Sequence, residues 1–276
     1  MTQAAEDLIA HGGGQPLSRR DRLRAATKDE IVQIARRILV KDGPQSVSLR
    51  AIAREMGMTA PGLYRYFTSH EELLKHLCGA IFTELGDGLQ EAIGRAASEY
   101  GTMPDADCTP GQIRAILTLK MAAACHEFRR WALGHTSEFS LIFGAPLPEI
   151  KDDGGYDFAE ECALQFAGTF FALYLELWQK AGFGVLEPDQ IDAGLRDQLI
   201  KYRDGLGVDL PLGAMLTFLR CWVLLYGAVS MEVFGHIGFA LEDASPMFEI
   251  TLTDIAALVG LDYPVPASEL PPAVSQ

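Results

Sequence analysis

The stretch from residue 46 to 70 constrains the fold of this chain more than any other part. It reads SVSLRAIAREMGMTAPGLYRYFTSH. Ser48 is placed to cap a first short helix, and Gly57 allows the sharp turn that follows it. Thr59 is placed to cap a second short helix, which the pattern predicts to run to about Phe67. Two short helices joined in this way are typical of a helix-turn-helix unit.

The second of these helices has two unlike sides. On a helical wheel Leu63 and Phe67 fall together, so they should face a core. The opposite side holds Pro61, Gly62 and Arg65, which would let the helix approach base edges in a DNA major groove, with Arg65 pairing to guanine. Hydroxyls and helix N-termini would contact phosphates. The predicted DNA-binding residues are Ser48, Arg50, Thr59, Ala60, Pro61, Gly62, Tyr64, Arg65, Tyr66 and His70.

The charge distribution supports this interpretation although the net charge is −14. Residues 18–75 hold 12 Lys and Arg against seven Asp and Glu, a net charge of +5, so the remaining residues carry −19. An acidic body repels polyanions and would favour docking through the basic head alone. The sequence also predicts a basic arm, which would follow the DNA backbone or enter a minor groove through Arg19, Arg20, Arg22 and Arg24.

The string LRAIAREMGMTAPGLYRYF at 49–67, followed by SHEELL at 69–74, resembles the signature of TetR-family transcriptional regulators. The sequence departs from that signature at Thr68 and His70, where the family usually has lysines. The resemblance implies a three-helix DNA-binding head on an all-helical body. It also implies a homodimer held by the last two long helices, and repression relieved by a small molecule bound in the body.

The whole chain is predicted to be all-α, because no segment shows sustained period-two alternation. The first helix should begin at a Thr27–Glu30 capping box, and a long helix linking head and body should open with a Ser69–Glu72 box. Body helices are expected near 111–134, 136–143, 156–181, 188–203, 212–235 and 246–259. The predicted organisation is a flexible basic arm (1–22), a helix-turn-helix DNA-binding domain (23–72), a helical ligand-binding and dimerisation domain (73–261) and a flexible tail (262–276).

Two sets of body residues are candidates for binding. Apolar and small residues at helical spacing in the last two helices predict a two-fold interface, with an intramolecular core as the alternative. The interface candidates are Leu216, Leu219, Val223, Gly227, Phe248, Leu252 and Ile255. Aromatic and polar residues would suit an unidentified apolar or aromatic effector. The ligand-binding candidates are His126, Trp131, Phe139, Phe143, Phe170, Tyr174, Trp178, Trp222 and Tyr226.

Other classes of function find little support in the residues. The five cysteines are widely spaced without a CxxC pair, so neither a zinc site nor a disulfide framework is expected, and reduced thiols suit the cytoplasm. No nucleophile elbow, phosphate loop or dinucleotide fingerprint occurs, so no cofactor, metal or enzymatic activity is predicted. The apolar stretch 221–241 contains Glu232 and His236, which favours a buried helix over a membrane span.

The sequence therefore predicts a dimeric regulator that binds a palindromic operator on double-stranded DNA, most simply a repressor. Three alternatives stay open at this point: a helical protein-interaction module without a DNA role, an enzyme on a helical scaffold, and a regulator that has lost its ligand response. A small, sealed cavity in the body would favour the last of these.

Overall fold

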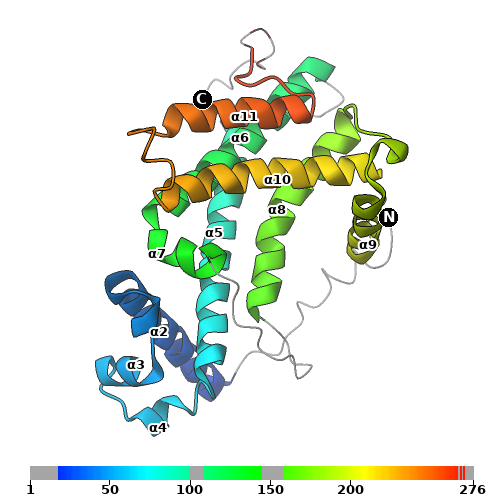
Figure 1. Cartoon of the computed structure of the whole chain (residues 1–276). Coiled ribbons are helices and arrows are strands. Elements are labelled where there is room, and N and C mark those ends of the chain that lie inside the picture. The colour runs from blue at the N-terminus through cyan, green and yellow to red at the C-terminus, as the bar shows by residue number, and fades with distance from the viewer. Residues whose placement is uncertain (1–17, 100–107, 145–157, 267, 269, 271–276) are drawn as a thin grey trace.

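The computed structural model describes residues 18–99, 108–144 and 158–266, together with 268 and 270. Every regular element in these residues is a helix, so the predicted all-α class is confirmed for the described part of the chain. Three helices form a small head, and α5 leads from it into a larger helical body (Figure 1). The buried cores of head and body are continuous along α5.

The head consists of α2 (Arg19–Asp42), α3 (Leu49–Glu55) and α4 (Ala60–Leu63). The prediction that the first helix begins at Thr27 is wrong. The hydroxyl of Ser18 accepts a hydrogen bond from the backbone N–H of Asp21 and caps α2 two turns earlier. Thr27 instead donates its hydroxyl proton to the carbonyl of Leu23, as threonines inside helices commonly do.

The second helix of the helix-turn-helix unit is shorter than predicted. Regular α-helix ends at Leu63, and the chain continues through a tighter turn in which the Tyr66 N–H donates to the Leu63 carbonyl. The turn before α4 matches the prediction, because Gly57 has a φ of +65° there. The Phe67 N–H still donates to the Leu63 carbonyl at 3.2 Å, and both side chains are fully buried, as the helical wheel predicts.

The long helix α5 (His70–Glu99) joins head and body. Its predicted capping box is present in altered form. The Ser69 hydroxyl accepts from the Glu72 N–H at 3.0 Å, but the Glu72 carboxylate accepts from the N–H and hydroxyl of Thr68. Two backbone N–H groups and one hydroxyl at the helix start are thus satisfied, which fixes the point where α5 leaves the head.

The body packs α5 along α6 (Pro110–Gly134) and α8 (Phe158–Lys180). Between α6 and α8 lie α7 (Thr136–Phe139) and a π-helical turn, Ser140–Gly144. A short turn, Pro188–Gln190, precedes α9 (Ala193–Leu206). The last two helices, α10 (Leu212–Val233) and α11 (Ser245–Leu258), pack on each other at the far end from the head (Figure 1).

Helix α10 is not the fully buried helix that the sequence predicted. Among the described residues it alone is long and apolar enough to cross a membrane, with a mean hydropathy of 1.7. Only 39% of that apolar window is buried within the chain. One side of α10 packs on the body, while Val223 on the other side is 66% exposed. The helix therefore presents an apolar surface that the described residues do not cover.

The structure describes only the last residues of the predicted arm, but it describes the start of the predicted tail. Most of the predicted arm, residues 1–17, lies outside the described residues. In the predicted tail, the hydroxyl of Tyr263 donates to the Glu249 carboxylate at 2.6 Å and lies 3.1 Å from His126 Nε2. The start of that tail is therefore docked on α6 and α11, because these contacts join side chains across the fold.

Candidate nucleic-acid interface

The candidate interface is built on the starts of α3 and α4. The Thr59 hydroxyl accepts from the Gly62 N–H at 3.3 Å, and the Ser48 hydroxyl accepts from the Ala51 N–H at 3.2 Å. Both predicted caps are therefore present. They fix the direction of each helix, and helix N-termini favour phosphate oxygens.

Burial separates the two sides of α4 and its following turn. Leu63 and Phe67 are fully buried and anchor the element to the head core. Pro61 and Arg65 are exposed, and the Tyr64 ring is 50% exposed. Among the other candidates, Arg50 and Thr59 are exposed, whereas Ser48, Ala60, Gly62, Tyr66 and His70 are half-buried. The side with the small residues and Arg65 is thus open to a partner.

A groove of about 490 Å³ opens beside this turn, between it and the first turns of α2. Its lining residues are Arg19, Arg20, Leu23, Arg24, Thr27, Arg65 and Tyr66. Four of these are arginines and none is acidic, so the groove concentrates positive charge next to the exposed side of α4. Such a surface attracts a phosphate backbone and holds it in register.

The sequence predicts a flexible arm over residues 1–22, but its last residues do not form an arm, because Arg19–Arg24 lie in the first turns of α2. Arg24 also contacts the turn after α4 directly. Its Nη2 donates to the backbone carbonyl of Arg65 at 2.9 Å, and its guanidinium carbon lies 5.7 Å from the centroid of the Tyr66 ring. Sequence reasoning missed this link, since the partners are 41 residues apart and follow no local pattern.

His70, which the sequence predicts to contact DNA, makes a hydrogen bond inside the head. Its Nε2 lies 2.8 Å from the carbonyl oxygen of Val47, which can only accept, so this ring nitrogen donates the hydrogen bond. The ring thereby ties the start of α5 to the residue before the Ser48 cap. We therefore leave His70 out of the DNA contacts proposed below.

The nine predicted ligand-binding residues do not line one pocket. Five of them belong to a cluster of rings that contact one another in the centre of the body: Phe139, Phe143, Phe170, Trp222 and Tyr226. Phe128 and Phe166 also belong to this cluster. Rings that fill the space between helices in this way pack the core and leave little room for a ligand.

The other four candidates lie outside this ring cluster. Tyr174 and Trp178 both pack edge-on against Phe183 in a second apolar cluster. His126 contacts Tyr263 at the docked tail, as described above. Trp131 points its indole N–H toward Glu84 on α5, at 3.4 Å. Aromatic composition alone therefore did not predict which residues share a site.

An open groove of about 710 Å³ lies between α5 and α6 and is lined by residues that include Glu84, Trp131 and His135. Two interior cavities of the body are much smaller in this conformation. One of about 40 Å³ is lined by residues that include Phe170, Tyr174 and Trp222, and a neighbouring one measures about 30 Å³. Ligand pockets usually measure about 300–1,000 Å³. Burial raises the pKa of Cys125 to about 12 and that of Cys221 to about 11, so the two thiols in the larger cavity's wall stay protonated and neutral.

The predicted interface residues divide into two groups. Val223 is exposed, and Leu216, Leu219 and Gly227 are half-buried along α10. The three on α11 point inward instead, because the body core buries them: Phe248, Leu252 and Ile255. The outward apolar residues of α11 are Met247 and Ile250, at 45% and 55% exposure. Periodicity found the apolar stripe of α11 but could not tell which neighbour it faces.

A small head with an open, arginine-lined helix-turn-helix unit, carried on a larger helical body, defines the class of helix-turn-helix transcriptional regulators. Two family models match the chain: "Bacterial regulatory proteins, tetR family" over residues 31–77 and "Tetracyclin repressor-like, C-terminal domain" over residues 121–255. The chain belongs to the TetR family of DNA-binding transcriptional regulators.

Relatives and solved structures agree with this assignment. The HTH-type transcriptional regulator Rv1816 of Mycobacterium tuberculosis is 28% identical over 224 residues, which cover 80% of this chain and 86% of that one. The crystal structure of a proposed regulatory protein, SCO4313, is 25% identical with a TM-score of 0.62, covering 87% of this chain and all of that one. A protein of unknown function from Rhodococcus, 18% identical with a TM-score of 0.53, shares the fold over 91% of this chain and 98% of its own.

The family sets aside the interaction module without a DNA role, and it points to a transcription factor that is not an enzyme. Among the described residues, no group of three or more His, Cys, Asp or Glu side chains is placed to hold a metal ion.

Proposed function

We propose that this chain acts in the cytoplasm as a homodimer that binds a palindromic operator and represses transcription. The observation that carries the DNA contact is the arginine-lined groove beside the exposed side of α4. In this proposal Arg65 reads a base edge, and Pro61 and Gly62 permit close approach. The backbone is held by Arg19, Arg20, Arg24, Arg50, Tyr64, Tyr66 and the helix caps at Ser48 and Thr59.

The exposed apolar surface of α10 and α11 supports the homodimer. Val223, Leu224 and Met231 on α10 are all at least 36% exposed, as are Met247 and Ile250 on α11. Apolar surfaces of this kind mark interaction sites on proteins. Two copies joined through α10 and α11 would bury them and present two heads to one palindrome, as an isologous interface requires.

We further propose that an apolar or aromatic effector releases the operator by entering between α6, α8 and α10. The two cavities of about 40 and 30 Å³ meet at Met121, Cys125 and Ile255, so outward movement of these side chains would join them. An effector that prefers the expanded body shifts the dimer toward a head arrangement that fits the operator poorly. The small volumes of these two interior cavities support a second candidate, a regulator that has no ligand response.

Binding to the DNA flanking the protein's own coding region tests the operator proposal. Fluorescence anisotropy of labelled fragments should show one inverted repeat bound by two protomers, with affinity falling steeply as salt rises. Lys201→Ala, an exposed lysine on α9 of the body, is the control and should leave affinity unchanged. Salt-independent binding, or equal binding to every fragment, would contradict the proposal.

Ligand release has its own test. Trp222 lines the larger cavity, so its fluorescence should change on titration with aromatic compounds that also weaken operator binding. A screen in which no compound raises the melting temperature or weakens operator binding would favour the regulator without a ligand response.

A further inference from the structure

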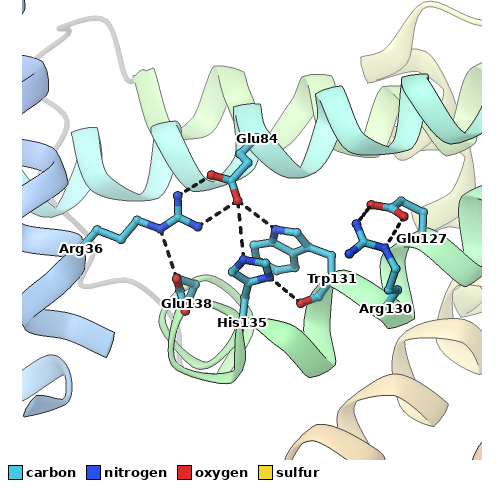
Figure 2. Close-up of polar contacts among 7 residues, drawn as sticks. All are labelled: Arg36, Glu84, Glu127, Arg130, Trp131, His135 and Glu138. Atoms are coloured by element: carbon cyan, nitrogen blue, oxygen red, sulfur yellow. Dashed lines mark hydrogen bonds and ion pairs between the residues drawn. The ribbon is translucent and has the colours of Figure 1, made fainter. Parts of the chain in front are cut away.

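Arg36 joins three helices at the boundary between head and body (Figure 2). It lies on α2, and its Nε donates to Glu138 Oε1 on α7 at 3.1 Å. Its Nη2 donates to Glu84 Oε1 on α5 at 2.9 Å, and its Nη1 bonds the other oxygen of the same carboxylate. One guanidinium therefore holds a carboxylate on α5, which runs from the head into the body, and a second carboxylate on α7, which belongs to the body.

The contact is partly screened from water. The Arg36 side chain is 18% exposed and that of Glu138 only 5% exposed, while Glu84 is 44% exposed. A carboxylate as buried as Glu138 strongly favours keeping its cation. Arg36 is therefore more restrained than an ordinary surface arginine, whose ion pairs contribute little.

Glu84 is also held from the body side. The same Oε1 that accepts from Arg36 accepts from the Trp131 indole N–H at 3.4 Å and lies 3.9 Å from His135 Nε2. The two rings stack at 5.0 Å, and His135 Nδ1 lies 2.9 Å from the Trp131 carbonyl oxygen. Figure 2 shows Trp131 of α6 and His135, the residue after α6, both facing Glu84. Groups of the body therefore hold the carboxylate that accepts from Arg36.

Apolar packing between α2, α5 and α7 is non-directional, so it permits small rotations of the head. A planar guanidinium with three directed hydrogen bonds does not. Figure 1 shows α4 at the end of the head away from α7. A small rotation of the head about Arg36 would therefore move α4 and the turn that follows it by a larger amount.

We infer that Arg36, through Glu84 and Glu138, is a positioning residue that sets the angle of each head and thereby the half-site spacing that the dimer accepts. The inference rests on the proposed function, because spacing has meaning only for two heads on one operator. Arg36 would then affect which operators are bound although it lies away from the turn after α4.

The test uses palindromic duplexes in which the two half-sites are moved apart or together by one or two base pairs. Wild-type affinity should fall about tenfold or more for one base pair, since each base pair turns a half-site by roughly 35° about the DNA axis. Arg36→Lys and Glu138→Gln should bind an isolated half-site like the wild type but lose most of this discrimination, to about threefold or less, because lysine cannot form the planar fork.

Arg37→Lys is the matched control, because Arg37 pairs with Glu55 inside the head at 3.1 Å and should leave the spacing profile unchanged. Melting temperatures show which variants are folded, and Glu84→Gln replaces any variant that is not. Unchanged spacing profiles in the folded variants would overturn the inference and leave the proposed function intact. A wild-type protein that binds single half-sites as tightly as any palindrome would overturn the proposed function instead.

Discussion

A hydrogen bond joins Arg24 on α2 to Arg65 in the turn after α4: the guanidinium of Arg24 donates to the backbone carbonyl oxygen of Arg65 at 2.9 Å. The contact holds the turn after α4 against the first turns of α2. Two surfaces proposed to touch DNA, the arginine-lined groove and the exposed side of α4, therefore behave as one rigid unit.

Arg24→Ala should weaken operator binding by about 1–2 kcal/mol, or roughly 5- to 30-fold, because the turn loses a charge-assisted hydrogen bond and the DNA backbone loses a proposed contact. Fluorescence anisotropy measures the change, with Lys201→Ala on the body as the reference for loss of a distant positive charge. An Arg24→Ala protein that binds the operator like the wild type would show that the Arg24–Arg65 hydrogen bond does not order the turn after α4.

Gly213→Ala should destabilise the fold. A Cβ at this position would lie 2.1 Å from the backbone oxygen of Leu186, and backbone atoms cannot move aside cheaply. We expect a loss of about 1–3 kcal/mol in the free energy of unfolding, measured by urea denaturation. Gly86→Ala is the matched helical control, since a Cβ there meets nothing within 4 Å. It should be neutral or stabilise by about 0.5–1 kcal/mol, and equal effects of the two substitutions would contradict the packing seen at Gly213.

Glu84 should make stability depend on pH. The hydrogen bond from Arg36 lowers the pKa of the Glu84 carboxyl below its usual 4.5, although burial opposes the shift. Below the unfolded pKa the unfolded chain binds this proton and the folded chain does not, so stability falls as pH falls through the lowered folded value. Urea unfolding at about pH 6 and about pH 3.5 should show a smaller acid loss in Glu84→Gln than in the wild type. Identical losses would mean that the contact to Arg36 contributes nothing to folding.

Val223→Asp should weaken the homodimer, because it places a charge on the outward face of α10 where the side chain is 66% exposed in the single chain. Sedimentation velocity should show a shift toward monomer. Val40→Asp on the head, at 54% exposure, is the control and should stay dimeric. A Val223→Asp protein that remains fully dimeric would place the interface elsewhere.

Local chemistry made the head predictable from sequence. Ser48, Gly57 and Thr59 act within a few residues of themselves, so their positions indicated where α3 and α4 begin and where the chain turns. The start of α2 was missed because Thr27 and Glu30 match a capping box, whereas in the fold Ser18 caps the helix and Thr27 lies inside it.

Contacts between distant residues were not predictable. Arg36 meets Glu138 across 102 residues, and no single-sequence pattern links them. The aromatic residues of the body were recognised as a group, but rings that contact one another and rings that line a cavity have the same composition. The stripe of α11 was likewise visible, yet periodicity does not show that Phe248 and Ile255 face their own chain.

The most direct test of the account is the effect of Arg65→Ala on an operator in which each base pair is varied in turn. If Arg65 reads a base edge, the substitution should cost about 1–3 kcal/mol in binding free energy and abolish preference at one base pair in each half-site. Equal weakening on every sequence, with all base preferences retained, would mean that Arg65 touches only the DNA backbone and would contradict the account.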